Sequence, residues 1–188
     1  MQDAAGIDAL VQLAKAGELG RVRALLASNF LLASQRLPSG ESPLMSALYR
    51  GHHDIVAALI DAGAEIDVFA AAATGRLKDL HRTVSEATVN TYAYDGWTPL
   101  HLAAFFGFVD AARMLVDAGA DVHAVSRNSM ENTPLHAAAA GKHSDVALLL
   151  MAHGADPLRT DAGGYTPLEI AKQNQLDSVV AAIPSGRS

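Results

Sequence analysis

The sequence predicts an all-α solenoid in which about six short helix-turn-helix units, each with a turn or short β-hairpin finger, stack on one another. Three observations predict this fold. A hydroxyl-Pro-Leu pattern occurs four times, a Gly-Ala-acid pattern follows the proline by 20 residues in three units, and apolar residues at helical spacing lie between the two. The hydroxyl-Pro-Leu segments are Ser42–Leu44, Thr98–Leu100, Thr133–Leu135 and Thr166–Leu168.

The residues within each unit indicate where its helices begin and end. A Ser or Thr before Pro is typical of a helix start, because the hydroxyl caps free N–H groups and Pro at the first helical position loses no hydrogen bond. Gly51, Gly75 and Gly107 are expected to end the first helix of their units, and Gly119 and Gly154 lie near the end of a second helix. Neither helix buries its apolar face alone, so adjacent units must stack.

The units differ in length and in their entry sequences. The third unit is shortened and lacks the Thr-Pro-Leu entry, and the fifth has a longer lead-in and Lys142 where the helix-ending glycine is expected. We expect one domain over residues 1–188, with Pro184 to Ser188 as a frayed tail. The expected units are 6–36 (an N-terminal cap), 37–66, 67–92 (shortened), 93–125, 126–159 and 160–184 (a C-terminal cap).

Composition excludes several classes of protein. The net charge of −6 disfavours nucleic acid as a partner, since like charges repel phosphate. The longest apolar run, Val146 to Ala152, is too short to span a membrane, and no secretory signal is recognisable. The absence of Cys excludes disulfides and thiolate sites. These features predict a cytoplasmic protein without a membrane partner.

One stretch of the chain resembles a known repeat family. Asp95 to Ala104 (DGWTPLHLAA), followed by Gly107 and by Leu115 to Val122 (LVDAGADV), is similar to an ankyrin repeat. The resemblance covers roughly residues 6 to 184, and the runs from Val68 to Ala72 and from Ala103 to Gly107 also resemble a bacterial-type variety of ankyrin protein.

The resemblance implies a structural role for two histidines. His101 and His136 follow Thr-Pro-Leu, and in the family this His hydrogen-bonds to the Thr and to adjacent backbone, which joins one unit to the next. Met45 and Glu169 occupy this position in two other units and depart from the pattern. We found no nucleophile elbow, phosphate-binding loop or zinc-hydrolase spacing, so no catalytic residue, metal site or cofactor is expected.

The resemblance also implies which residues face a partner, namely the turn tips and the end of the first helix. Six of the ten aromatic residues fall between Tyr92 and Phe108. We expect Trp97 and Tyr94 to be exposed partner contacts, whereas Phe105 and Phe106 serve equally well to fill the gap beside the shortened third unit. Val68 and Phe69 are expected in the core, and Phe108 over the turn between two helices. The candidate partner-binding residues are Tyr94, Asp95, Trp97, Phe105, Phe106, Tyr49, Arg50, Met130 and Tyr165.

The predicted function is that of a non-catalytic scaffold or adaptor that binds an unidentified protein through its concave face and turn tips. Two alternatives stay open. The aromatic residues favour self-association if they pair between copies, although we expect a monomer with at most weak self-association. A small-ligand site or an enzyme pocket at the third unit is the other alternative, and its candidate lining residues are Asp67, His81, Glu86 and Asp95.

Overall fold

The computed structural model describes residues 4–183, which hold twelve α-helices, one 3₁₀-helix and no β-strand. The chain divides into two compact units, one ending at Ile66 and the other beginning at Asp67, and each is described by itself. The expectation of a single domain stays a prediction. The tail from Pro184 to Ser188 lies outside the described residues.

The first unit contains two helix pairs. Helices α1 (Ala4–Ala16) and α2 (Leu19–Ser28) form the first pair, which the 3₁₀-helix η1 (Phe30–Ser34) follows. Helices α3 (Pro43–Tyr49) and α4 (His53–Asp61) form the second. Helix α1 packs on α3 and α2 packs on α4, so that Leu10, Val22 and Ile55 are fully buried between them. Each pair thus covers the apolar face of its neighbour, as stacking predicts.

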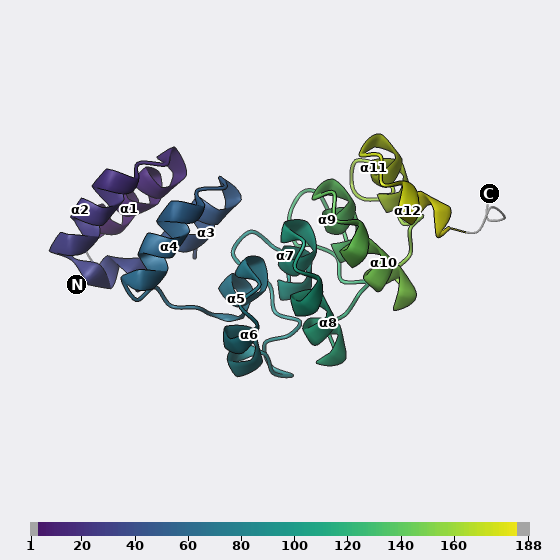
Figure 1. The fold of residues 1–188 in the computed structure, drawn as a ribbon, viewed down its shortest axis with the longest axis horizontal. Coiled ribbons are helices and arrows are strands. Elements are labelled where there is room, and N and C mark those ends of the chain that lie inside the picture. Colours follow the sequence, from purple (N-terminus) through teal and green to yellow (C-terminus); the bar gives the residue numbers. More distant parts are fainter. Residues whose placement is uncertain (1–3, 184–188) are drawn as a thin grey trace. The chain divides into compact units, whose positions relative to one another are not determined.

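The second unit contains four helix pairs. These are α5 (Val68–Thr74) with α6 (Leu77–Thr83), α7 (Pro99–Phe106) with α8 (Val109–Asp117), α9 (Pro134–Ala140) with α10 (Ser144–Ala152), and α11 (Pro167–Gln173) with α12 (Asp177–Ala181). Within this unit the first helices α5, α7, α9 and α11 form one layer, and the second helices α6, α8, α10 and α12 form the other (Figure 1). The expected all-α repeat solenoid is confirmed.

The predicted helix starts are confirmed at the hydroxyl-Pro-Leu segments. Ser42, Thr98, Thr133 and Thr166 are N-caps whose side chains accept a hydrogen bond from the backbone N–H three residues later. The shortened third repeat begins differently, because Asp67 caps α5 and its Oδ1 accepts the N–H of Ala70 at 2.8 Å. The carboxylate therefore replaces the hydroxyl-Pro entry that this repeat lacks.

In the fourth and fifth repeats, the chain adopts a left-handed backbone conformation just after the first helix. Gly107 has φ of 80°, and Lys142 takes up the equivalent conformation in the fifth repeat with φ of 64°. A lysine there is strained, because a Cβ atom disfavours positive φ. The preceding residue, Gly141, has an ordinary φ of −73° but lies so close to α7 that a Cβ on it would be 2.2 Å from the backbone oxygen of Phe105. Gly141 thus permits the close packing of α9 on α7.

The core residues expected around the shortened repeat are only partly buried. Val68 is buried, as expected, whereas Phe69 is half-buried. Phe108 packs over the turn between α5 and α6, since a Cβ on Gly75 would lie 2.3 Å from the Phe108 ring. The expectation that Phe108 covers a turn between two helices is therefore confirmed, and the turn is that of the preceding repeat.

Candidate partner-binding surface

Three consecutive turns of the second unit precede helices α7, α9 and α11. Each is closed by a backbone hydrogen bond: the N–H of Ala93 to the oxygen of Trp97 at 2.8 Å, that of Ser126 to Asn132 at 2.8 Å, and that of Asp161 to Tyr165 at 2.9 Å. The middle turn is two residues longer than the other two. None of the three is part of a strand, so the expected fingers are turns rather than regular hairpins in the described residues.

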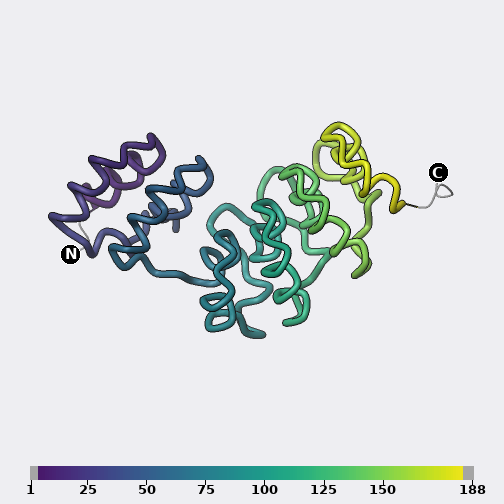
Figure 2. Tube along the Cα trace, in the orientation of Figure 1, coloured from purple at the N-terminus to yellow at the C-terminus, as the bar shows by residue number. Residues whose placement is uncertain are grey.

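Backbone hydrogen bonds join these turns to each other. The N–H of Arg127 donates to the oxygen of Gly96 at 2.8 Å, and the N–H of Ala162 donates to the oxygen of Met130 at 2.9 Å. Gly96 has φ of 82°, and a Cβ on it would lie 2.6 Å from the Arg127 backbone. Figure 2 follows the chain through these three turns of the second unit. They form a connected frame rather than three independent loops.

Each of the three turns carries one exposed large hydrophobic side chain. Tyr94, Met130 and Tyr165 are 39%, 51% and 53% exposed. We call these three residues the turn-tip row. Large apolar side chains exposed in three successive repeats are unusual because burial normally removes them from water. All three were candidate partner contacts in the sequence, and the structure brings them onto adjacent turns.

The expectation that Trp97 is exposed is wrong. Its side chain is only 8% exposed, stacks on His101 at 6.0 Å between ring centroids, and meets Phe105 edge-on at 5.2 Å. Trp97 follows the left-handed Gly96, and the tight turn directs its indole inward onto α7. A turn position alone therefore did not reveal the direction of this side chain.

Phe105 and Phe106 lie at the C-terminal end of α7 and are both half-buried. Their rings meet edge-on at 5.2 Å, and Phe105 also contacts Trp97. Such aromatic pairs contribute about 0.5–1.5 kcal/mol beyond the area they bury. The two residues thus stabilise the fourth repeat and still present part of their surface to solvent.

The remaining candidate residues have separate positions. Asp95 is half-buried, and its Oδ1 accepts the N–H of Trp97 at 3.1 Å, so this carboxylate shapes the turn. Tyr49 and Arg50 lie in the first unit, where Tyr49 is half-buried and Arg50 is the exposed C-cap residue of α3.

Residues in the longer middle turn have a role that the sequence did not reveal. The guanidinium carbon of Arg127 lies 3.8 Å from the centroid of the Tyr92 ring, and Asn128 Nδ2 donates to the oxygen of Asp95 at 2.9 Å. Both residues belong to the longer lead-in of the fifth repeat. The extra length of this lead-in was the sequence feature that could have indicated their role. The longer lead-in therefore joins the turn of the fifth repeat to the turn of the fourth repeat.

Two buried histidines connect the repeats beneath this surface. His101 Nδ1 lies 2.7 Å from Thr98 Oγ1 and accepts the N–H of Thr98 at 3.3 Å, while Nε2 lies 3.0 Å from the oxygen of Asn132. His136 makes the same contacts to Thr133 and, one repeat further on, to the oxygen of Tyr165. An acceptor at Nδ1 requires the proton on Nε2, so both rings are neutral. The expected bridging role is confirmed.

The surroundings of these rings keep them neutral. Burial lowers the pKa of His101 to about 4, and its hydrogen bond to Asn132 only partly opposes this effect. Burial also lowers the pKa of His136. Neither ring is placed as a proton donor or acceptor toward solvent, because both ring nitrogens already hold the backbone together.

The other two repeats with a hydroxyl-Pro-Leu entry, the second and the sixth, use carboxylates instead of this histidine. In the second repeat, where Met45 takes its position, Glu41 pairs with Lys15 of the first repeat at 2.9 Å and accepts the hydroxyl of Ser46 at 2.8 Å. In the sixth repeat, Glu169 Oε2 accepts the N–H and hydroxyl of Thr166, and the backbone hydrogen bond chiefly lowers the pKa of this carboxyl. Glu169 thus caps its own helix.

The residues proposed for a pocket at the third repeat have other surroundings. Asp67 and Asp95 accept backbone N–H groups, while His81 and Glu86 are exposed. Among residues 4–183, no three His, Asp or Glu side chains are grouped as a metal would require. Over the same range, no helix has the length and apolar character needed to cross a membrane.

Comparison with known proteins agrees with the fold. The sequence matches the family described as "Ankyrin repeats (3 copies)" over residues 1–70, 68–161 and 124–183. It is 34% identical over 146 residues to the Neurogenic locus Notch protein of Drosophila melanogaster, covering 77% of this chain and 5% of that protein. It is also 36% identical over 92 residues to Rabankyrin-5 of Mus musculus, covering 48% of this chain and 8% of that protein.

A third relative shows how varied the matched proteins are. The putative E3 ubiquitin-protein ligase XBAT35 of Arabidopsis thaliana is 38% identical over 90 residues, which is 47% of this chain and 20% of that protein. This chain thus spans a fifth or less of each of these three relatives. The similarity lies in the repeats, and the family profile covers almost every residue. The chain belongs to the ankyrin repeat family.

Proposed function

We propose that this protein is a non-catalytic interaction module that binds a partner protein through the turn-tip row and the exposed parts of Phe105 and Phe106. The observation that carries the proposal is the exposure of Tyr94, Met130 and Tyr165 on three turns joined by backbone hydrogen bonds. Aromatic residues and Met are enriched at protein interfaces, and they supply much of the binding energy there. Ankyrin repeats generally serve as protein-protein interaction modules.

The stiffness of the frame supports this proposal. The hydrogen bonds from Arg127 to Gly96 and from Ala162 to Met130 hold the turns before any partner arrives. A surface that is already ordered loses less conformational entropy on binding, so more of the contact energy appears as affinity. Truncation of one such anchor by alanine typically costs about 2 kcal/mol, which corresponds to about a 30-fold loss of affinity.

The test compares capture by wild-type protein with capture by a triple variant, Tyr94→Ala, Met130→Ala and Tyr165→Ala. The control is Leu77→Ala, since Leu77 is 37% exposed on α6 but does not lie on a turn tip. Proteins recovered from a lysate would be identified by mass spectrometry and then titrated in purified form by calorimetry. We expect a partner that the wild type and the Leu77 variant bind and the triple variant does not.

Two results would contradict the proposal. If the purified partner binds the triple variant with unchanged affinity, the row is not the binding surface. If wild-type protein forms a dimer in sedimentation experiments and the triple variant is a monomer, the row mediates self-association instead. Trp97 is unsuited to this test because it is buried.

The location, one excluded class of partner and the variety of ankyrin protein are finer assignments that rest on the sequence. We propose a cytoplasmic location and no nucleic acid partner, on the basis of the missing Cys and the net charge of −6. Fractionation of the source cells, with an antibody against this chain, tests the location. The resemblance to a bacterial-type variety rests on the runs around Val68 and Phe105 quoted above.

A further inference from the structure

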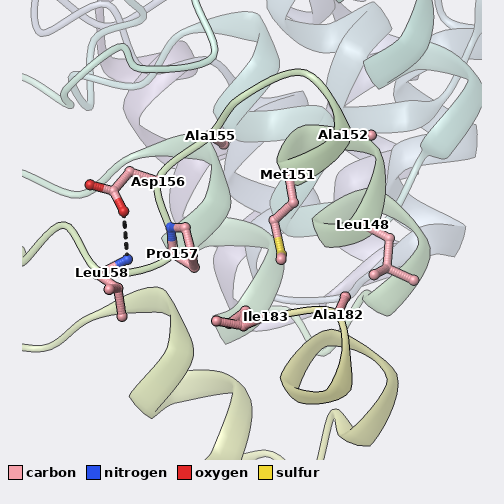
Figure 3. A pocket seen from close by; sticks show the side chains of 9 residues that line it. All are labelled: Leu148, Met151, Ala152, Ala155, Asp156, Pro157, Leu158, Ala182 and Ile183. Carbon is pink, nitrogen blue, oxygen red and sulfur yellow. Dashed lines mark hydrogen bonds between the residues drawn. The ribbon is translucent and has the colours of Figure 1, made fainter. Parts of the chain in front are cut away.

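We infer that the second unit carries another docking site, an apolar groove bounded by α10, the loop after it and the two residues that follow α12, which accepts one turn of an amphipathic helix from a partner protein. The groove has a volume of about 450 Å³, and it shares no residue with the turn-tip row. Figure 3 shows Met151 extending from α10 into the space bounded by Pro157 and Ile183. The lining residues are Leu148, Met151, Ala152, Ala155, Asp156, Pro157, Leu158, Ala182 and Ile183.

The groove exists because α12, the second helix of the sixth repeat, is short. Helices α4, α8 and α10 have nine residues each, whereas α12 has five. Its continuation is limited by Pro184 in the sequence, because the residue before a proline disfavours α-helical backbone. Helix α10 packs along α8. Helix α12 is four residues shorter than α10, a difference of about 6 Å in helix length, and so leaves part of α10 uncovered.

A comparison of the fourth and fifth repeats shows that this surface is specifically apolar. Positions 35 residues apart are equivalent, because α8 spans Val109–Asp117 and α10 spans Ser144–Ala152. Three lining residues of the groove replace polar or charged residues of the fourth repeat, all of which are exposed. Leu148 replaces Arg113, Ala152 replaces Asp117, and Leu158 replaces His123.

These replacements distinguish the groove from an ordinary repeat end. These positions carry Leu, Ala and Leu where the fourth repeat carries Arg, Asp and His, so the lining is a contiguous apolar surface rather than one exposed side chain. Leu158 is nonetheless 39% exposed, and Leu148 and Met151 are half-buried. The three changes converge on one hollow, which points to a partner that covers it.

The geometry of the stack identifies the occupant as a helix. Helix α8 packs on α10, and α10 packs on α12. The groove continues this row of packed helices, at the place where one more helical turn after α12 would lie. The fitting partner is therefore a helix that presents two Leu or Ile side chains one turn apart.

The charge of the lining adds one requirement. Asp156 is the single charged residue among the nine, and its Oδ1 accepts the N–H of Leu158 at 2.9 Å, which fixes the carboxylate at the rim (Figure 3). A Lys or Arg beside the two aliphatic residues of the partner helix would lie near this carboxylate. An amphipathic helix with a basic edge therefore fits better than one with an acidic edge.

The experiment uses synthetic peptides of about 16 residues, held helical by a staple on the polar face. They carry Leu or Ile at i and i+4 with Lys on the flank, and the matched control peptides carry Ser at both of those positions. Binding to the full chain is followed by fluorescence anisotropy and by the ¹³C-methyl resonance of Met151. We expect the apolar peptides to bind and to shift the Met151 resonance, and the Ser peptides to bind at least tenfold more weakly.

Two protein variants test the location of the site. Leu148→Arg and Leu158→His install the residues of the fourth repeat, where Arg113 and His123 are tolerated at equivalent places, so both variants should fold with unchanged circular dichroism. Each should weaken the apolar peptides at least tenfold, whereas Tyr165→Ala on the turn-tip row should not. Failure of every peptide to bind, or equal binding to the Leu148 variant, overturns the inference. A wild-type dimer that Leu148→Arg dissociates would assign the groove to a second copy and also overturn it.

Discussion

His101 Nε2 donates a hydrogen bond to the backbone oxygen of Asn132, 3.0 Å away in the next repeat, while Nδ1 accepts from Thr98 in its own repeat. One neutral ring thereby connects two repeats through main-chain atoms. Protonation would place a second N–H at Nδ1, directed at the N–H of Thr98, so the hydrogen bond from Thr98 depends on the ring staying neutral.

The first prediction concerns pH. The folded pKa of His101 is about 4 and that of His136 is also lowered, whereas an unfolded His titrates near 6.5. Below that value the unfolded chain binds more protons, so the free energy of unfolding should fall as the pH drops from about 6.5 toward 4. The slope is at most about 1.4 kcal/mol per pH unit for each ring. Urea denaturation between pH 7 and 4 measures it.

A matched variant isolates the histidine contribution from that of the carboxylates. His101→Met installs the residue that the second repeat carries as Met45, and it should reduce the pH slope while lowering the stability at pH 7. Equal slopes in the wild type and the Met variant would show that His101 does not titrate with folding.

The second prediction concerns Trp97. Because Trp97 is buried against His101 and Phe105, Trp97→Ala should lower the free energy of unfolding by about 3 kcal/mol. Tyr94→Ala, three residues earlier and 39% exposed, should change it by less than about 0.5 kcal/mol. Chemical denaturation of both variants checks the contrast, and similar losses for the two would show that the turn does not direct Trp97 inward.

The third prediction concerns the strained Lys142. Its φ of 64° favours glycine, so Lys142→Gly should raise the free energy of unfolding by about 1 kcal/mol. Lys172→Gly provides the control, since Lys172 lies in the last turn of α11 with helical backbone and its replacement should be destabilising by about 0.5 kcal/mol. Thermal unfolding ranks the two variants, and a loss of stability at both positions would rule out the left-handed assignment.

The fourth prediction concerns Gly141, which needs space rather than an unusual dihedral angle. Gly141→Ala should lower the free energy of unfolding by about 2 kcal/mol, because the new methyl group would overlap the backbone oxygen of Phe105. Gly20→Ala in α2 meets no atom within 4 Å and should instead be stabilising by about 0.5–1 kcal/mol. If both variants gain stability, α7 and α9 do not approach as closely as described.

The sequence sufficed for the fold because local chemistry repeats along it. The Thr-Pro-Leu segments mark the helix starts, and the caps at Thr98, Thr133 and Thr166 confirm them. The histidine bridges followed from family resemblance, and both were confirmed. The carboxylate that serves in the second repeat, Glu41, was not foreseen, since its partner Lys15 is 26 residues away in the chain.

The candidate surface was harder to predict because it depends on side-chain direction. Tyr94 and Trp97 belong to one turn and looked equivalent in sequence, but only Tyr94 is exposed. The left-handed Gly96 and the close approach of Arg127 decide the difference, and both depend on the neighbouring repeat. The groove at Leu148 and Leu158 was missed, although comparing equivalent positions 35 residues apart would have indicated it.

The bonds that tie the three turns together, from Arg127 to Gly96 and from Ala162 to Met130, use main-chain atoms at both ends. Such bonds do not depend on which side chain Tyr94, Met130 or Tyr165 happens to be. Under the proposed function, exchange of these three residues would redirect the module to a new target without rebuilding its architecture. The hydrogen bonds that hold the three turns together and the three exposed side chains on them are thus separate sets of atoms.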